Sequence, residues 1–218
     1  MKALVVGATG ETGRRIVQEL VARQIPVKAM VRNLDLAKTV LPPEAELVFG
    51  DVLQPESLKA GMDSCDVVLC ATGARPSLDP SGPMQVDYWG TRNLVDVAKT
   101  QGIQKFVLVS SLCVSQFFHP LNLFWLVLYW KKQAEAYLQQ SGLTYTIVRP
   151  GGLKNEDNSD AIILAKADTL FEGRIPRQKV SRICVEALFQ ATANNKIIET
   201  VTQPDLPQVA IAELFATV

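Results

Sequence analysis

The chain opens on the stretch Lys2-Ala3-Leu4-Val5-Val6-Gly7-Ala8-Thr9-Gly10-Glu11-Thr12-Gly13. Its start is a short apolar run typical of a buried β-strand, and three glycines follow with the spacing G-x-x-G-x-x-G. The next residues, 14–21, carry apolar side chains at positions 16, 17, 20 and 21, which share one face of a helix. The sequence therefore predicts a strand, a tight glycine turn and a helix in direct succession.

A turn of this kind can hold a diphosphate. Glycines let the backbone turn sharply and approach a phosphate closely, and the helix start offers unpaired N–H groups and the positive end of its dipole. The spacing differs from the G-x-G-x-x-G fingerprint, but the strand before it and the helix after it are the context that such a site needs. We predict that Gly7, Gly10 and Gly13 form part of a site for NAD or NADP.

The rest of the chain alternates strand and helix patterns. Strands are expected near 2–6, 27–32, 46–49, 66–71, 105–110 and 143–149, and helices near 12–24, 34–39, 55–61, 85–101, 122–141, 178–193 and 208–216. Near-continuous apolar runs indicate strands covered on both faces, and therefore a parallel sheet. We expect an α/β fold with one doubly wound parallel sheet of the Rossmann type, of strand order 3-2-1-4-5-6, and a possible seventh strand near 196–201.

Residues 1–218 are expected to form one NAD(P)-binding domain, with a small substrate-side region drawn from about 150–218. The least regular stretches, 72–83 and 150–177, should lie past the carboxyl ends of strands, where ligands bind in such folds. The expected walls of the acceptor cleft are residues 72–83, 112–125 and 150–160.

Composition narrows the classes of function. Lys plus Arg equals Asp plus Glu at 22 each, so no basic excess points to nucleic acid. The first strand begins at once, so no targeting segment is predicted and a cytoplasmic location is expected. The four cysteines form no C-x-x-C pair, which favours reduced, buried thiols over disulfides or zinc, and no metal site is predicted.

The end of the second expected strand bears on the choice of dinucleotide. An acidic residue there would bind the ribose 2′-hydroxyl of NAD, whereas an arginine suits the 2′-phosphate of NADP. The chain has Arg32 at this point and no carboxylate before Asp35, and Arg14 could add a second positive charge. We therefore predict NADP(H) as the cofactor; the alternative is that Arg32 is a solvated strand end.

Several motifs follow one another in the order of a known family. They are Gly7 to Gly13, Val31-Arg32-Asn33, Gly50-Asp51-Val52, Ala71-Thr72-Gly73, Gly90-Thr91-Arg92-Asn93-Leu94, Val107 to Ser111, Lys131 to Glu135 and Tyr145 to Gly152. Together they resemble the atypical short-chain dehydrogenases/reductases with NAD(P)-binding domains. Within that group the chain is most similar to plant and cyanobacterial members related to the Tic62 dehydrogenase domain, and more loosely to biliverdin reductase B, a flavin reductase.

The resemblance implies a set of cofactor contacts. The diphosphate would lie against Gly7, Thr9, Gly10, Glu11, Thr12 and Gly13, and Arg32 would hold the 2′-phosphate. Asp51 and Val52 would flank the adenine, while Ala71, Thr72 and Gly73 would line the ribose. Ser110 would lie near the nicotinamide, which Pro150, Gly151 and Gly152 would cover, and Lys131 would contact its ribose.

The catalytic motif of the well-known reductases is missing. They carry Tyr-x-x-x-Lys on the helix after the fifth strand, where the tyrosine exchanges a proton with the carbonyl oxygen and the lysine binds the ribose. Here the residue four places before Lys131 is Val127, and the one before Lys132 is Leu128. Tyr129, three residues before Lys132, could supply a displaced acid, so the candidate catalytic residues are Lys131, Ser110 and Tyr129.

The absence of this tyrosine affects which hydride acceptor is expected. Carbonyl reduction needs a proton donor as well as a hydride, whereas a flavin or quinone can take its proton from solvent. We expect an NADPH-dependent oxidoreductase that acts on a small planar acceptor, a flavin or a quinone. The alternatives are a non-catalytic NADP(H)-sensing module that acts through a protein partner, and a carbonyl reductase or epimerase with a relocated acid.

The segment 117–130 contains no acidic residue, lysine or arginine. One interpretation is a helix buried against the sheet, whose first turn forms a wall of the substrate loop. The other is an exposed apolar face that docks a protein partner or a membrane surface. Within the segment, His119 is expected to be a loop residue rather than a catalyst. In the later loops, Asp168 is expected to be solvated.

Overall fold

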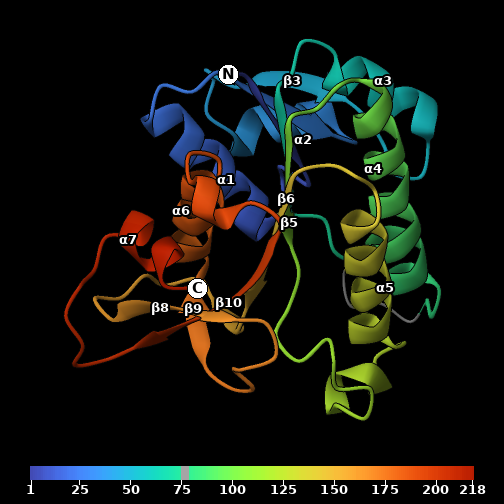
Figure 1. The fold of residues 1–218 in the computed structure, drawn as a ribbon. Coiled ribbons are helices and arrows are strands. Elements are labelled where there is room, and N and C mark those ends of the chain that lie inside the picture. Colours follow the sequence, from blue (N-terminus) through green and yellow to red (C-terminus); the bar gives the residue numbers. More distant parts are fainter. Residues whose placement is uncertain (75–78) are drawn as a thin grey trace.

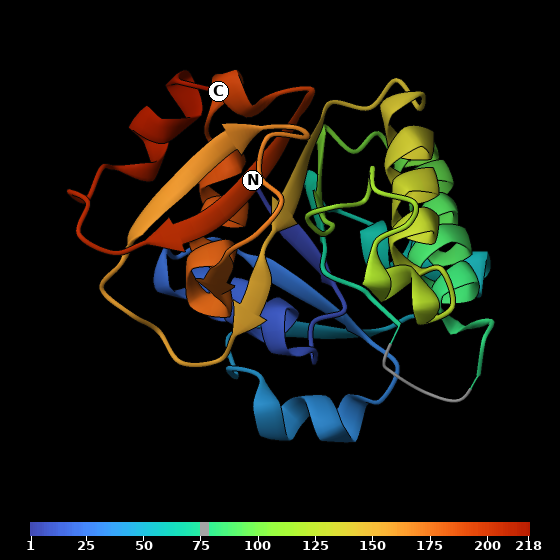
Figure 2. The same ribbon diagram turned by 90° about the horizontal axis from the view of Figure 1, so that it is seen from below.

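The computed structural model describes residues 1–74 and 79–218. In this part of the chain, an eight-stranded sheet of order β3-β2-β1-β4-β5-β6-β10-β8 lies between two layers of helices (Figures 1 and 2). The parallel strands are β1 (Ala3–Val6), β2 (Val27–Val31), β3 (Glu46–Phe49), β4 (Val67–Cys70), β5 (Lys105–Val109), β6 (Tyr145–Pro150) and β10 (Lys196–Gln203). The predicted Rossmann-type sheet and its strand order are confirmed, and β10 is the predicted seventh strand.

The helices cover both faces of this sheet. They are α1 (Glu11–Ala22), α2 (Leu34–Val40), α3 (Pro55–Met62), α4 (Thr91–Thr100), α5 (Val127–Gln139), α6 (Arg177–Ala187) and α7 (Ile211–Ala216). A π-helix, η1 (Pro83–Gly90), precedes α4, and 3₁₀ turns occupy η2 (Pro120–Leu123) and η3 (Ala191–Ala193). Helices α1, α6 and α7 lie on one side of the sheet, and α4 and α5 lie on the other (Figure 1).

Two apolar cores result from the alternation of side chains along the strands. In β1, Ala3 and Val5 pack into the core beneath α1 and α6, while Leu4 and Val6 pack into the core beneath α3 and α4. Every residue of β1 is buried, as expected for a strand covered on both faces. The sheet is thereby fixed from both sides, and the carboxyl ends of its parallel strands meet at one edge.

The stretch 150–177, expected to be irregular, contains three strands. β7 (Gly152–Lys154) pairs in parallel with β9 (Arg174–Pro176), and β8 (Ala161–Lys166) joins the main sheet antiparallel to β10. Strands as short as β7 and β9 carry too few residues for a periodic signal. Their pairing joins segments far apart in the sequence and lies beyond local pattern analysis.

Helix α5 begins at Val127 rather than near 122. Trp125 and Leu126 adopt φ angles of 56° and 57°, in the left-handed region, where an L-residue cannot continue a right-handed helix. The preceding segment projects as a separate lobe beyond the lower end of α5 (Figure 1). Its exposed large apolar residues are Phe117, Phe118, Leu121, Leu123, Phe124, Trp125 and Leu126.

The interpretation of a helix buried against the sheet therefore fails for residues 117–126. The side chain of Phe118 is 96% exposed and that of Leu123 is 84% exposed. Within residues 1–74 and 79–218, no helix has both the length and the apolar character needed to cross a membrane. Contact of this lobe with a partner or a membrane surface stays a prediction.

Candidate functional site

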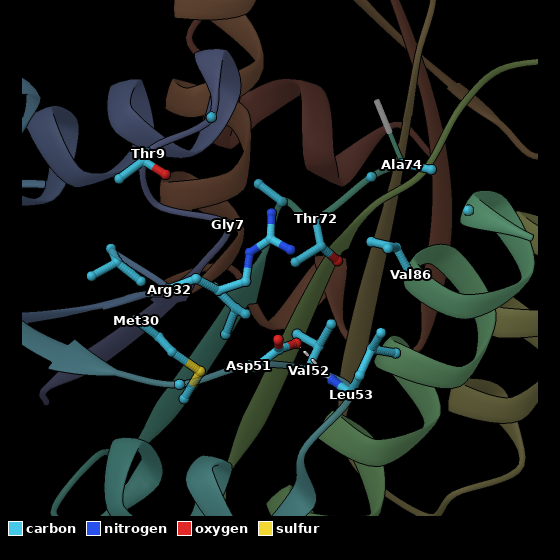
Figure 3. Close-up of a pocket in the computed structure, with 17 residues that line it drawn as sticks. Gly7, Thr9, Met30, Arg32, Asp51, Val52, Leu53, Thr72, Ala74 and Val86 are labelled. Carbon is cyan, nitrogen blue, oxygen red and sulfur yellow. Dashed lines mark hydrogen bonds between the residues drawn. The ribbon is translucent and has the colours of Figure 1, made fainter. Parts of the chain in front are cut away.

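A cavity of about 330 Å³ lies at the carboxyl ends of β1, β2 and β4. Its walls come from the β1–α1 turn, the end of β2, the turn after β3 and the segment after β4, with Gly82 and Val86 closing one side (Figure 3). In doubly wound folds, dinucleotides bind at this edge, where neighbouring crossovers leave the sheet on opposite faces. The expected wall 72–83 lies partly here, and its residues 75–78 fall outside the described residues.

Two glycines make the β1–α1 turn possible. Gly7 adopts φ +78°, and a Cβ atom at this position would lie 2.7 Å from the backbone oxygen of Ala71. A Cβ on Gly13 would lie 2.1 Å from the backbone oxygen of Gly7, so only glycine lets α1 pack so closely on the turn. No side chain caps α1, and its first N–H groups have no acceptor within the helix. The turn thus fits a diphosphate.

Arg32 extends into the middle of this cavity, toward Thr72 (Figure 3). None of the ion pairs formed by the described residues includes Arg32, so its charge has no carboxylate partner there. On the far wall, the Asp51 carboxylate accepts a hydrogen bond from the backbone N–H of Leu53 at 3.0 Å through one oxygen (Figure 3). The geometry leaves a guanidinium directed into the space that an adenosine would fill.

A buried ion pair closes the inner end of the cofactor groove. Lys131 on α5 contacts the Asp87 carboxylate of η1 at 2.7 Å, and the other carboxylate oxygen accepts from the backbone N–H of Ala74 at 3.2 Å. Burial alone would lower the pKa of Lys131, but the negative charge and hydrogen bond of Asp87 outweigh it and raise that pKa. Lys131 therefore remains a cation that can donate hydrogen bonds and cannot act as a base.

Ser110 lines two cavities. A small cavity of about 10 Å³ is lined by Thr72, Ser110 and Lys131, and Thr72 also lines the first cavity. A second large cavity, of about 360 Å³, shares Ser110 and continues along Pro150 to Leu153. The Ser110 hydroxyl is buried and has no hydrogen-bond partner among the described residues. A buried polar atom of this kind is suited to contact a bound ligand.

Phe171, Glu172 and Gly173 of the loop 168–173 line the second cavity, and a largely buried ionic cluster holds this loop. Arg149 on β6 contacts Glu135 of α5 at 2.7 Å, Asp168 at 2.8 Å and Glu199 of β10 at 3.3 Å. Glu199 also accepts from the backbone N–H groups of residues 168, 169 and 170. The loop is thus fixed against both α5 and the sheet.

Asp168 belongs to this cluster and also keeps the exposure to solvent that was expected of it. It is half exposed, and burial alone would raise its pKa, but a hydrogen bond with Ser115 and the charge of Arg149 lower the pKa. The Arg149 guanidinium has a raised pKa because its hydrogen bonds and its attraction to Glu135 and Asp168 outweigh the cost of burial.

The structure places most predicted cofactor contacts along these cavities. Lining the first are Gly7, Thr9, Gly10, Arg32, Asp51, Val52, Ala71, Thr72 and Gly73; Ser110, Pro150 and Gly151 line the second, and Lys131 lines the small one. Glu11, Thr12 and Gly13 do not line them: the Glu11 carboxylate instead contacts Arg14 and Arg15. Tyr129 packs edge-on against Phe117 and Trp130, outside the three cavities, so its catalytic role stays a prediction.

Sequence reasoning passed over Asp87 and Arg149. Asp87 is the one charged residue of Pro83–Gly90, and an isolated carboxylate in an apolar stretch was its only signal. Arg149 ends an apolar strand, so the pattern alone did not separate it from a solvated strand end. Their partners, Lys131 and Glu135, lie 44 and 14 residues away along the chain.

The chain belongs to the family of NAD(P)H-binding proteins, whose family model matches residues 7–191. An uncharacterized chloroplastic protein of Arabidopsis thaliana is 44% identical over 100% of this chain and 82% of its own length. The chloroplastic protein TIC 62 of the same plant is 34% identical over 97% of this chain, which spans only 37% of TIC 62. Sanguinarine reductase of Eschscholzia californica is 31% identical over 94% of this chain and 90% of its own. The predicted family resemblance is confirmed.

Solved structures agree with the fold. A Bacillus halodurans structure that carries an NAD-dependent epimerase/dehydratase name has a TM-score of 0.89 and 27% identity, with 100% of both chains covered. The anaerobilin reductase ChuY of Escherichia coli O157:H7 has a TM-score of 0.79 and 25% identity, over 96% of this chain and 100% of its own. The expectation of a cytoplasmic location is wrong on these comparisons, because the relatives that name a compartment are chloroplastic.

Proposed function

We propose that the protein is an NADPH-dependent reductase that passes a hydride to a small planar acceptor, a flavin or a quinone. One observation carries the proposal: a small cavity shares Thr72 with the dinucleotide groove and Ser110 with a second large cavity, while the lysine that lines this small cavity pairs with Asp87 rather than with a tyrosine. The site thus has space for two ligands but lacks the usual proton donor. An acceptor that takes its proton from solvent suits such a site.

The residues of the chain would have the following binding roles. NADPH, when bound, supplies the hydride. The Arg32 guanidinium would bind the 2′-phosphate, and Lys131, held as a cation by Asp87, would donate hydrogen bonds to the nicotinamide ribose. The Ser110 hydroxyl would donate a hydrogen bond at the junction of the two cavities. The loop 168–173 would limit access of water to the acceptor.

Reductase names among the similar proteins support an oxidoreductase. Two of the relatives carry reductase names, for sanguinarine and for anaerobilin. The chloroplastic relatives favour a plastid as the setting of the reaction. The exposed lobe 117–126 adjoins the acceptor cavity through His119 and Leu121, so an apolar acceptor could reach the cavity along it.

Anaerobic mixing tests this function. The protein and NADPH are mixed with FMN, riboflavin, a short-chain quinone or a panel of ketones, and loss of NADPH absorbance is followed. Turnover of a flavin or quinone, with no turnover of ketones, is expected. Tight NADPH binding without any turnover would instead favour the redox-sensing module. Ketone turnover that disappears in Tyr129→Phe would favour a carbonyl reductase or epimerase with a relocated acid.

A further inference from the structure

The second cavity contains an arginine without a carboxylate partner. Arg177, the first residue of α6, is half-buried and lines this cavity together with Ser110. Its guanidinium donates hydrogen bonds to the side-chain oxygen of Asn155 at 2.8 Å and to the backbone oxygen of Leu153 at 3.4 Å, which are both neutral acceptors. None of the ion pairs of the described residues includes Arg177.

Its surroundings are positively charged. Arg15 donates a hydrogen bond to the backbone oxygen of Asn155 at 3.3 Å, so Arg15 and Arg177 both donate to the same residue. The nearby carboxylate, Glu11, is already shared by Arg14 at 2.7 Å and Arg15 at 2.9 Å. Burial and the charges of Arg15 and Arg14 lower the pKa of Arg177, although Glu11 opposes them. An anion bound beside Arg177 would relieve this repulsion.

We propose that Arg177 binds an acidic group of the acceptor, a phosphate or a carboxylate, in the second cavity. A guanidinium presents two parallel N–H donors that match the oxygens of either group. The two large cavities would then be alike, because each is lined by one arginine without an ion pair: Arg32 for the cofactor and Arg177 for the acceptor. This inference rests on the proposed function and adds to it the charge of the substrate.

The diphosphate of the cofactor is also an anionic group, and it is the alternative ligand for Arg177. The residues of the glycine turn, Gly7, Thr9 and Gly10, line the first cavity, and none of them lines the second. Arg177 shares its cavity with Glu172, whose carboxylate would repel an anion that lay close to it. The lining therefore favours an acidic group that belongs to the acceptor and lies on the Arg177 side of the cavity.

FMN and riboflavin provide the test, because they share one ring system and differ by a phosphate. We compare the wild type with Arg177→Gln and with the control Arg174→Gln, an exposed arginine outside the cavities. In Arg177→Gln, KM for FMN should rise about tenfold or more while KM for riboflavin changes less than about twofold. Dissociation constants for FMN and riboflavin, measured by quenching of flavin fluorescence at saturating NADP⁺, should change by the same factors as the KM values. The control should keep the wild-type preference.

The results that would contradict the inference, the proposed function or both can be told apart. Equal changes for FMN and riboflavin would show that Arg177 does not contact the phosphate. Weaker NADPH binding with an unchanged FMN-to-riboflavin ratio would assign Arg177 to the cofactor diphosphate. Arg177→Lys keeps the positive charge and is the control for loss of the fold in Arg177→Gln. This variant should retain part of the FMN preference. Wild-type protein that binds FMN without reducing it would contradict flavin reduction alone, whereas no FMN binding at millimolar concentration would contradict both flavin reduction and this inference.

Discussion

Replacing Arg32 by alanine should separate the two nicotinamide cofactors. The guanidinium extends into the first cavity and has no ion-pair partner among the described residues, so its charge is available to a 2′-phosphate (Figure 3). A hydrogen bond to a charged group contributes roughly 1.5–3 kcal/mol. Because Arg32 is exposed in the free protein, solvent screening favours the lower part of this range. NADPH affinity should therefore fall about ten- to thirtyfold.

Titration calorimetry with NADPH and NADH checks this prediction. NADH lacks the 2′-phosphate, so its affinity should change less than about twofold in Arg32→Ala. Arg182→Ala serves as the control, because Arg182 is exposed on α6 and lies outside the cavities. Unchanged NADPH affinity would refute the role of Arg32. An equal loss for both cofactors would mean that Arg32 binds a part that they share.

Three further changes test the packing around the site. Gly13→Ala places a Cβ 2.1 Å from the backbone of the turn, so NADPH should no longer raise the melting temperature; a retained shift would contradict the diphosphate turn. Asp87→Ala leaves Lys131 buried without its partner and should lower the free energy of unfolding by about 3–5 kcal/mol. In urea unfolding, the double alanine variant should recover part of this loss, and a purely additive result would contradict the pair. Asp168 has a lowered pKa in the fold, so it stabilises the protein above its unfolded pKa of about 3.9 and loses this effect as pH falls through the folded pKa. Asp168→Asn should therefore lower the melting temperature more at pH 7 than near pH 3, and an equal effect at both would contradict the ion pair.

The sheet and the cofactor turn were predictable because their signals are local. A buried parallel strand must be apolar along its whole length, and a turn that meets a diphosphate needs glycine where a Cβ would collide, as at Gly7 and Gly13. Each requirement constrains residues within about a dozen positions of one another, so a local sequence pattern reveals it. The same reasoning placed Arg32 at the end of β2, where the structure has it lining the cavity.

Other features escaped because distant residues create them. The short strands β7 and β9 exist only as a pair, and the helix expected from 122 starts at Val127 because Trp125 and Leu126 turn left-handed. The predicted location was wrong for a different reason. The cytoplasmic expectation rested on the immediate start of the first strand, and the chloroplastic relatives overturned it.

The sequence by itself determined the class of fold, the order of its strands and the glycine turn at which we predict that the dinucleotide binds, because periodicity and glycine geometry are properties of neighbouring residues. Only the tertiary structure brought Asp87 to Lys131, gathered four charged side chains around the loop 168–173, and placed Arg177 in a second cavity with no ion pair to any described residue. Charges on separate strands and helices meet only when the sheet is assembled and buried, since their attraction depends on distance in space and on the exclusion of water.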